Sequence, residues 1–149
     1  MDRKQFIEIC DSSIKLVRTK AAFSQEKMAV IIGISKKTLV EIEKGRSSLG
    51  WAGSVVLCSI FCNSQVVLCT FGGNPTEIIH EIAFDGSEPQ YKKTGGGKIW
   101  WQTIMENDEN IIQQNIVSQH YRLLTADGRR LASSINLEDL TAIFNKNRN

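Results

Sequence analysis

The stretch that decides the fold of the first half of this chain is SQEKMAVIIGISKKTLVEIEKG, residues 24–45. Within it, Ser24 and Ser35 each precede a run of apolar side chains at helical spacing, and Gly33 and Gly45 each follow one. A serine hydroxyl accepts hydrogen bonds from the free amides of a first helical turn, whereas glycine adopts the left-handed conformation that ends a helix. The stretch therefore predicts two short helices joined by a tight turn.

Helical signals continue on both sides of this pair. Before it, apolar side chains recur three and four residues apart; after it, Asn74-Pro75-Thr76-Glu77 combines an N-cap residue, a proline at the first helical position and a glutamate three residues after the cap. Further helices are expected at residues 2–20, about 51–61, about 64–71 and 74 to about 84. The two very apolar ones must complete a shared helical core, so we expect one helical domain over residues 1–84.

The composition changes after residue 84. Residues 85–97 are polar and rich in glycine, which predicts a linker. Beyond them the apolar periodicity becomes about two, which is typical of strands. Strands are expected at residues 99–105, 111–117, 120–125 and 129–135, with Asp127-Gly128 as a hairpin turn between the last two.

The second domain, residues 98–149, is expected to end in a helix capped by Asn136. Its apolar side chains, predicted to cover one face of the sheet, are Leu137, Leu140, Ile143 and Phe144. The predicted fold class is therefore α+β: an all-helical domain followed by a small antiparallel meander of three or four strands with a C-terminal helix.

Residues 24–45 resemble the helix-turn-helix of the XRE family of lambda-repressor-like transcriptional regulators. The resemblance covers roughly residues 11–70 and does not extend to the second domain. The matching positions that have a packing or turn role are Ala29, Gly33, Ile34, Leu39 and Gly45. Departures from the family pattern are the apolar Val30 and Ile31 and the stretch 49–53, which lacks the usual proline.

The resemblance implies that the helix from Ser35 to Lys44 enters the major groove of DNA. Lys36 and Lys37, at its start, would then donate to guanine, and Glu41, one turn later, would accept from cytosine. Positions implied to contact the DNA backbone are Gln25, Thr38, Lys44 and Arg46. The alternative for these cations is an ordinary solvated face.

Charge is distributed unevenly in a way that favours this assignment. The net charge of the chain is only +2, but residues 1–50 hold ten Lys and Arg against six Asp and Glu, whereas residues 51–149 hold eight against ten. A basic half beside an acidic one points to the first domain as the part that meets nucleic acid.

Partners are expected through the second domain. Regulators of this class bind two half-sites about 34 Å apart, so a homodimer is expected. Trp100 and Trp101 are adjacent on a predicted strand and point to opposite faces; one is expected under the last helix, and the other needs a second cover, either another subunit or the first domain. The second domain also carries a polar group, which is interpreted either as the lining of an effector pocket or as the ordinary exposed face of a sheet. Its members are Gln113, Gln114, Asn115, His120 and Arg122.

No catalytic residue, cofactor or metal site is predicted. Gly95-Gly96-Gly97-Lys98 lacks the first glycine and the Ser or Thr of a phosphate-binding loop, and His80 and His120 lack metal-ligand spacing. The four cysteines are interpreted as buried thiols; Cys58, Cys62 and Cys69 would share a helix face only if Asn63-Ser64 did not break the helix.

The sequence thus favours a homodimeric DNA-binding repressor. The alternatives are an interaction protein, such as an antitoxin that binds a partner through its C-terminal sheet, and a regulator that senses an effector. No signal peptide or membrane-spanning run is found, so a cytoplasmic protein is expected, with no membrane partner.

Overall fold

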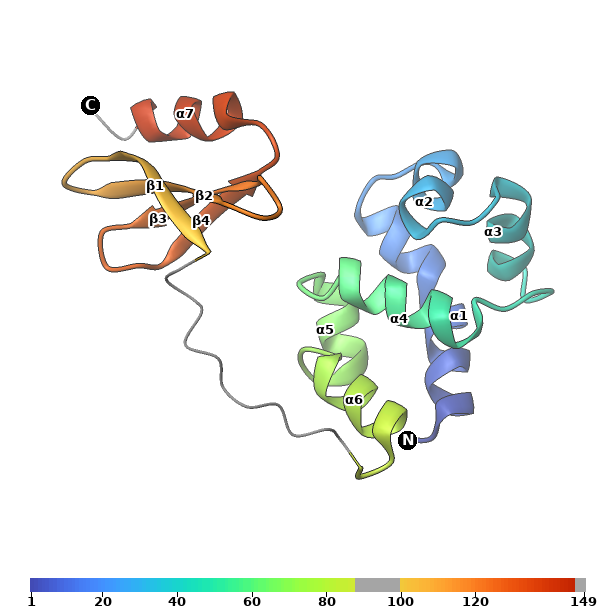
Figure 1. Ribbon diagram of the computed structural model, residues 1–149. Coiled ribbons are helices and arrows are strands. Elements are labelled where there is room, and N and C mark those ends of the chain that lie inside the picture. Colours follow the sequence, from blue (N-terminus) through green and yellow to red (C-terminus); the bar gives the residue numbers. More distant parts are fainter. Residues whose placement is uncertain (88–99, 147–149) are drawn as a thin grey trace. The chain divides into compact units, whose positions relative to one another are not determined.

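Among the residues that the structure describes, six helices form the first unit of the protein, and a four-stranded sheet with one helix forms the second (Figure 1). The structure is a computed structural model and describes residues 1–87 and 100–146. The two units divide between Gln90 and Tyr91, and each is described by itself. The fold class is α+β, as the periodicities predict. Most of the predicted linker and the first residue of the predicted 99–105 strand lie outside the described residues.

The first unit contains helices of seven to eighteen residues. They are α1 (Arg3–Lys20), α2 (Gln25–Ile32), α3 (Lys36–Glu43), α4 (Gly50–Ile60), α5 (Gln65–Phe71) and α6 (Thr76–Phe84). The predicted ranges agree with these bounds to within about two residues, which is the ordinary uncertainty of helix ends.

Helix α1 begins at a capping box and buries one face. The Asp2 carboxylate accepts from the Gln5 amide at 2.8 Å, and the Gln5 side chain accepts from the Asp2 amide at 2.9 Å. Phe6, Cys10 and Ile14 lie four residues apart and are fully buried, so they form the stripe that the other helices cover.

Residues 33–35 join helices α2 and α3, and a serine caps the start of each helix. The Ser24 hydroxyl caps α2 by accepting from the Lys27 amide at 3.1 Å, and Ser35 caps α3 by accepting from the Thr38 amide at 3.0 Å. Between them Gly33 has φ +80°, a left-handed conformation that favours glycine. The predicted pair of helices with a tight turn is confirmed.

One hydrophobic core unites the first unit. Leu39 and Ile42 of α3 and Leu57 and Cys58 of α4 pack against the buried stripe of α1, together with buried side chains from every other helix. None of the helices within residues 1–87 and 100–146 has the length and apolar character that crossing a membrane requires.

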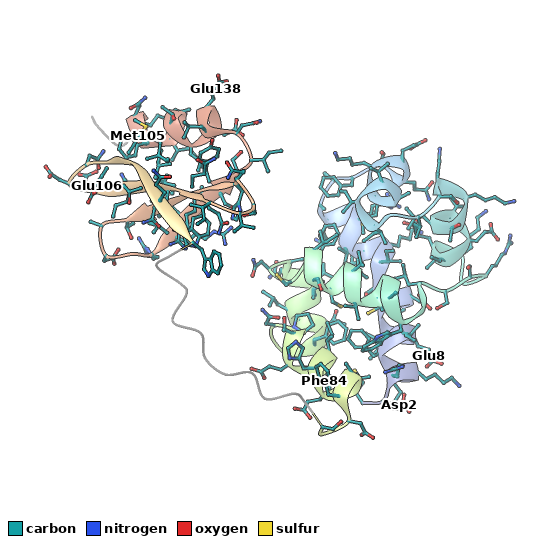
Figure 2. All side chains as sticks on the ribbon, in the orientation of Figure 1. Asp2, Glu8, Phe84, Met105, Glu106 and Glu138 are labelled. Atoms are coloured by element: carbon teal, nitrogen blue, oxygen red, sulfur yellow. The ribbon has the colours of Figure 1, made fainter. Side chains whose placement is uncertain are left out.

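The second unit is an antiparallel meander with one covered face. Strands β1 (Trp101–Glu106), β2 (Asn110–Asn115), β3 (Tyr121–Thr125) and β4 (Arg130–Ser134) lie in sequence order, and α7 (Leu137–Lys146) follows. Side chains from the sheet and from α7 fill the layer between them (Figure 2). The buried members of this second core are Ile112, Leu123, Leu140 and Phe144.

Two predictions about this unit are wrong. Ile143 does not join the covered face, because it is 40% exposed while Leu140 and Phe144 are buried. The helix is short, so its buried stripe is narrow and leaves Ile143 at its edge. Trp100 is not on a strand either: it lies in a turn, and β1 begins at Trp101.

Candidate functional site

The residues that the sequence singles out around α3 lie at the beginning of α2, along α3 and just after it. We call this set the α3 surface: Gln25, Ser35, Lys36, Lys37, Thr38, Glu41, Lys44 and Arg46. Lys36, Lys37, Lys44 and Arg46 are exposed, whereas Gln25, Thr38 and Glu41 are half-buried. Four cations therefore face solvent on one short helix and the turn that follows it.

Ser35 and Thr38 are used to start the helix. The Ser35 hydroxyl accepts from the Thr38 amide and lies 2.8 Å from the Thr38 hydroxyl. Both side chains thus stabilise the first turn of α3. Their contribution to a binding surface is to fix the direction in which the neighbouring lysines project.

Lys36 and Lys37 differ in their partners. The Lys36 ammonium makes an ion pair and a hydrogen bond with the Glu26 carboxylate of α2, across the turn. That hydrogen bond lowers the pKa of Glu26 below its ordinary value. Within residues 1–87 and 100–146, no ion pair involves Lys37. Lys37 is therefore the cation at the start of α3 that a ligand meets without displacing a carboxylate.

Glu41 lies between the two other cations of the surface. Its carboxylate is 3.7 Å from the Lys44 ammonium and 3.9 Å from the Arg46 guanidinium. Such exposed pairs contribute little to stability, about 0–1 kcal/mol, and exchange readily with solvent or a ligand. A role for Glu41 as an acceptor from cytosine would require it to leave both cations.

A nearly buried ion pair connects α1 to α3, and sequence reasoning missed it. Arg18 Nε and Nη2 donate to the two Glu43 carboxylate oxygens at 2.6 and 3.0 Å, with the side chains only 13% and 5% exposed. Gln25 Nε2 donates to Glu43 at 2.9 Å, and Arg18 Nη1 donates to the Phe23 carbonyl at 3.0 Å. We call these contacts the Arg18–Glu43 clamp; it joins α1, α2 and α3.

The clamp keeps Glu43 ionised. Burial by itself raises the pKa of the Glu43 carboxyl, but hydrogen bonds from Arg18 and Gln25 and the Arg18 charge outweigh burial and lower that pKa below its ordinary value. Gln25 is therefore part of the scaffold that orients α3, and its side-chain amide is already engaged. The sequence carried no signal for this, because periodicity does not reveal which polar residues meet across helices.

Comparisons of the chain with protein-family models, curated proteins and solved structures found no match. The candidate site is therefore argued from its own geometry.

In the second unit, the prediction that one tryptophan lies under the last helix is wrong. Trp101 pairs with Asn115, which is on the same face of β2 as Gln113. Ile112 and Leu123 form the core on the other face, under α7, because side chains alternate along a strand. Trp101 therefore lies on the face away from α7. The irregularity in register after Thr103 places Met105 on the core face although Trp101 and Thr103 lie on the other one, and simple alternation along the strand does not anticipate such a change.

Trp101 has a cation and an imidazole beside it. The Arg122 guanidinium lies 3.8 Å from the indole centroid, and the His120 ring meets the indole edge-on at 5.0 Å. Arg122 also donates to Gln113 at 2.7 and 3.0 Å. Within the predicted polar group, the side chains of Gln113 and Arg122 thus bond to each other. The side chains of Gln114, Asn115 and His120 bond instead to neighbouring residues outside the group.

Exposed apolar side chains gather at one end of this sheet. β1 starts, β2 ends, β3 starts and β4 ends there, and the Ile116 amide donates to the Trp100 carbonyl at 2.9 Å. We call the exposed residues at this end the sheet-end patch: Trp100, Ile116, Val117 and Ile135, each between 46% and 82% exposed. Trp100 and Ile116 are joined directly, whereas Ile135 follows the strand at the opposite edge of the sheet. Contiguous exposed apolar patches mark interaction surfaces.

The cysteines are not all buried, contrary to prediction. Cys10 and Cys58 are buried with their sulfurs 3.7 Å apart, whereas Cys62 is half-buried and Cys69 exposed. The contact with Cys58 and burial raise the pKa of Cys10 above its ordinary value, so this thiol stays protonated. The helix does break between Ile60 and Gln65, and no cluster of metal-ligating side chains occurs in the part of the chain that the structure describes.

Proposed function

We propose that this protein is a sequence-specific DNA-binding regulator of transcription, and that α3 reads the major groove as in lambda-repressor-like proteins of the XRE family. The observation that carries the proposal is the pair Lys36 and Lys37, exposed at the N-terminal end of a short helix whose orientation is held by its cap and by the Arg18–Glu43 clamp. Helices of this class present their N-terminal residues to base edges.

The chemistry of the α3 surface suits a duplex. Lys37 is available to donate to guanine O6 and N7, and Lys36 joins it once a phosphate or base replaces Glu26. Thr38, Lys44 and Arg46 are proposed to contact phosphates, which position the protein without reading sequence. Glu41 would release Lys44 and Arg46 to the backbone when DNA replaces it as their counterion.

We further propose that the regulator is a homodimer formed through the sheet-end patch. One helix-turn-helix makes too few contacts for useful affinity, so two half-sites are required. The patch supports this because four large apolar side chains at one end of a small sheet are exposed to solvent in a single chain. Sedimentation of the full chain over a range of concentrations should show a monomer–dimer equilibrium that Val117→Asp weakens.

DNA binding is tested with duplexes selected from a random library by the full chain, measured by fluorescence anisotropy across a salt series. Wild type should bind more weakly as salt rises, because phosphate counterions are released on binding. Lys37→Ala should lose about 1–3 kcal/mol of discrimination for its base pair. The matched control is Lys4→Ala, an exposed lysine of α1 that is paired with Glu8.

The proposal is wrong if selection enriches no sequence, or if Lys37→Ala and Lys4→Ala change the binding of the selected duplex equally. Repression is the expected sign, because a protein seated over an operator blocks polymerase. Deleting the protein should then raise expression of a reporter driven by the selected site, and a fall would identify an activator instead.

The second candidate is an interaction protein, such as an antitoxin, that binds a different polypeptide through the sheet-end patch. The same four exposed side chains favour it. The two proposals differ in what they predict for the chain without any other protein. A homodimer buries the patch between two copies of the chain. An interaction protein instead remains monomeric at concentrations where it binds its different partner stoichiometrically.

A further inference from the structure

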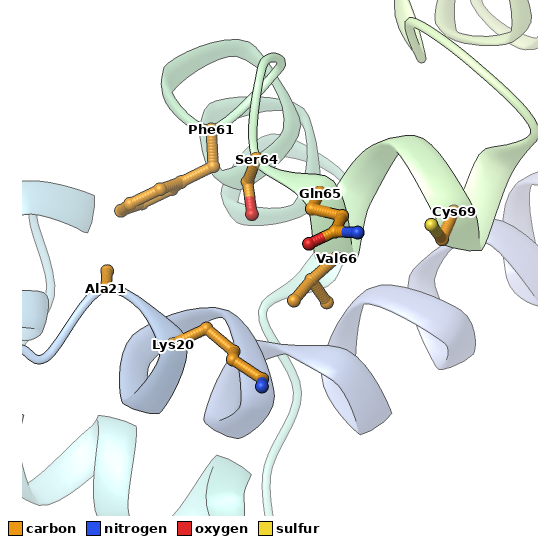
Figure 3. A pocket seen from close by; sticks show the side chains of 7 residues that line it. All are labelled: Lys20, Ala21, Phe61, Ser64, Gln65, Val66 and Cys69. Atoms are coloured by element: carbon orange, nitrogen blue, oxygen red, sulfur yellow. The ribbon is translucent and has the colours of Figure 1, made fainter.

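A cavity of about 630 Å³ lies in the first unit, where the end of α1 meets the corner between α4 and α5 (Figure 3). Its volume is within the range of about 300–1,000 Å³ that is typical of small-molecule sites. We call it the α1–α5 cavity. It lies outside the α3 surface and shares no residue with it.

The lining divides into an apolar part and a polar part. Phe61, Val66 and Ala21 supply hydrocarbon, while the Ser64 hydroxyl, the Gln65 side chain and Lys20 surround the same space in Figure 3. A ligand that fits must therefore combine an apolar body with a polar head group.

The polar part carries one positive charge that nothing balances within the described chain. None of the ion pairs in residues 1–87 and 100–146 involves Lys20. Ser64 precedes α5 without using its hydroxyl as a helix cap, so that hydroxyl is open to another acceptor. One ammonium beside uncharged donors matches a singly charged anion better than a doubly charged phosphate.

We propose that the α1–α5 cavity binds a small amphipathic monocarboxylate, with its carboxylate on Lys20 and Ser64 and its hydrocarbon body against Phe61 and Val66. The inference goes beyond DNA binding and does not depend on it. It assigns an effector site to the helical unit, whereas the sequence had placed the candidate effector group on the sheet.

The occupant would lie beside the segment that holds α3. The Phe61 ring packs on Phe23, with ring centroids 6.4 Å apart, and the Phe23 carbonyl accepts from Arg18 of the clamp. A ligand that moves Phe61 therefore acts on a residue that contacts the Arg18–Glu43 clamp directly.

The test uses the full chain without DNA and a panel of probes: hexanoate, octanoate, decanoate and phenylpropionate, with 1-octanol as the neutral analogue. Binding is measured by calorimetry and by the rate at which iodoacetamide alkylates Cys69, an exposed thiol that lines the cavity. Cys62 is the internal comparison. At least one carboxylate should bind saturably and slow the alkylation of Cys69 more than that of Cys62.

Single substitutions test the contacts to the carboxylate head group and to the hydrocarbon body of the ligand separately. Lys20→Gln should weaken carboxylate binding about tenfold, since it removes one charge-assisted contact, and should leave octanol binding unchanged. Phe61→Ala should weaken both. Lys15→Gln, an exposed lysine of the same helix that does not line the cavity, should change neither.

Three results overturn the proposal: no carboxylate of the panel binds, octanol binds as tightly as octanoate, or Lys20→Gln and Lys15→Gln have the same effect. An unchanged melting temperature for each variant shows that it is folded. None of these readouts involves DNA, so failure here leaves the proposed function standing, and failure to bind DNA leaves this proposal standing.

Discussion

At the scale of single residues, loss of the Arg18–Glu43 clamp should destabilise the first unit. Arg18→Met leaves the Glu43 carboxylate, only 5% exposed, without its cation. Breaking a fully buried pair in this way costs roughly 3–5 kcal/mol of unfolding free energy, and this pair, whose two residues are each half-buried, should lose less. Urea denaturation should show this loss, and the double variant Arg18→Met/Glu43→Leu should recover part of it, because no charge then remains buried. Equal losses in the single and double variants would contradict the account.

The same carboxylate makes stability depend on pH. Its pKa is lower in the folded state than its ordinary value of 4.5, so its contribution is fully present above that value and disappears as the pH falls below it, through the folded pKa. Wild type should therefore lose more unfolding free energy than Glu43→Gln between about pH 5 and pH 3. Parallel curves for the two proteins would show that Glu43 contributes nothing to this dependence.

Glu26 should oppose DNA binding by holding Lys36. Glu26→Gln removes a carboxylate from the α3 surface and frees the Lys36 ammonium, so the proposed function predicts tighter binding of the selected duplex, measured by anisotropy at fixed salt. Glu8→Gln releases Lys4 in the same way but lies on α1 away from this surface, and it is the control. An affinity unchanged by Glu26→Gln would mean that Lys36 does not meet DNA.

At the scale of elements, the sequence predicts where helices and strands occur but not how their polar side chains meet. Serine caps, terminal glycines and apolar periodicity identify every helix and strand that the structure describes, because these signals are local. The Arg18–Glu43 clamp joins residues 25 positions apart, and the face of Trp101 depends on an irregular register after Thr103. Both arise from tertiary packing, for which the local pattern has no counterpart.

Gly33, in the turn between α2 and α3, tests the prediction that glycine ends α2 by adopting the left-handed conformation. A Cβ at this position would meet no atom within 4 Å, so the cost of Gly33→Ala is conformational and not steric. With φ at +80° we expect a loss of about 1 kcal/mol in urea denaturation. Gly33→Asn should cost less, since asparagine tolerates the left-handed region better. Equal costs for both substitutions would contradict this explanation.

At the scale of the whole molecule, the described residues of the two units form two hydrophobic cores that share no residue. Leu123→Ala should therefore remove about 2–5 kcal/mol from the second unit, by the usual cost of a cavity in a core, and leave the first unit unchanged. Amide hydrogen exchange resolves the two, because protection should fall in β2, β3 and α7 while the amides of α1 and α4 keep theirs. A parallel loss in both units would show that they unfold together.

The reactivity of the thiols described above can report how often the first unit opens. Cys10 and Cys58 are in contact inside the core, while Cys69 lies in solvent a short way along the same chain. A thiol reagent should therefore modify Cys69 at the rate of a free cysteine and modify the inner pair only during the rare moments when α1 and α4 separate. The ratio of the two rates is an equilibrium constant for that separation, obtained under native conditions, without denaturant and without an introduced label.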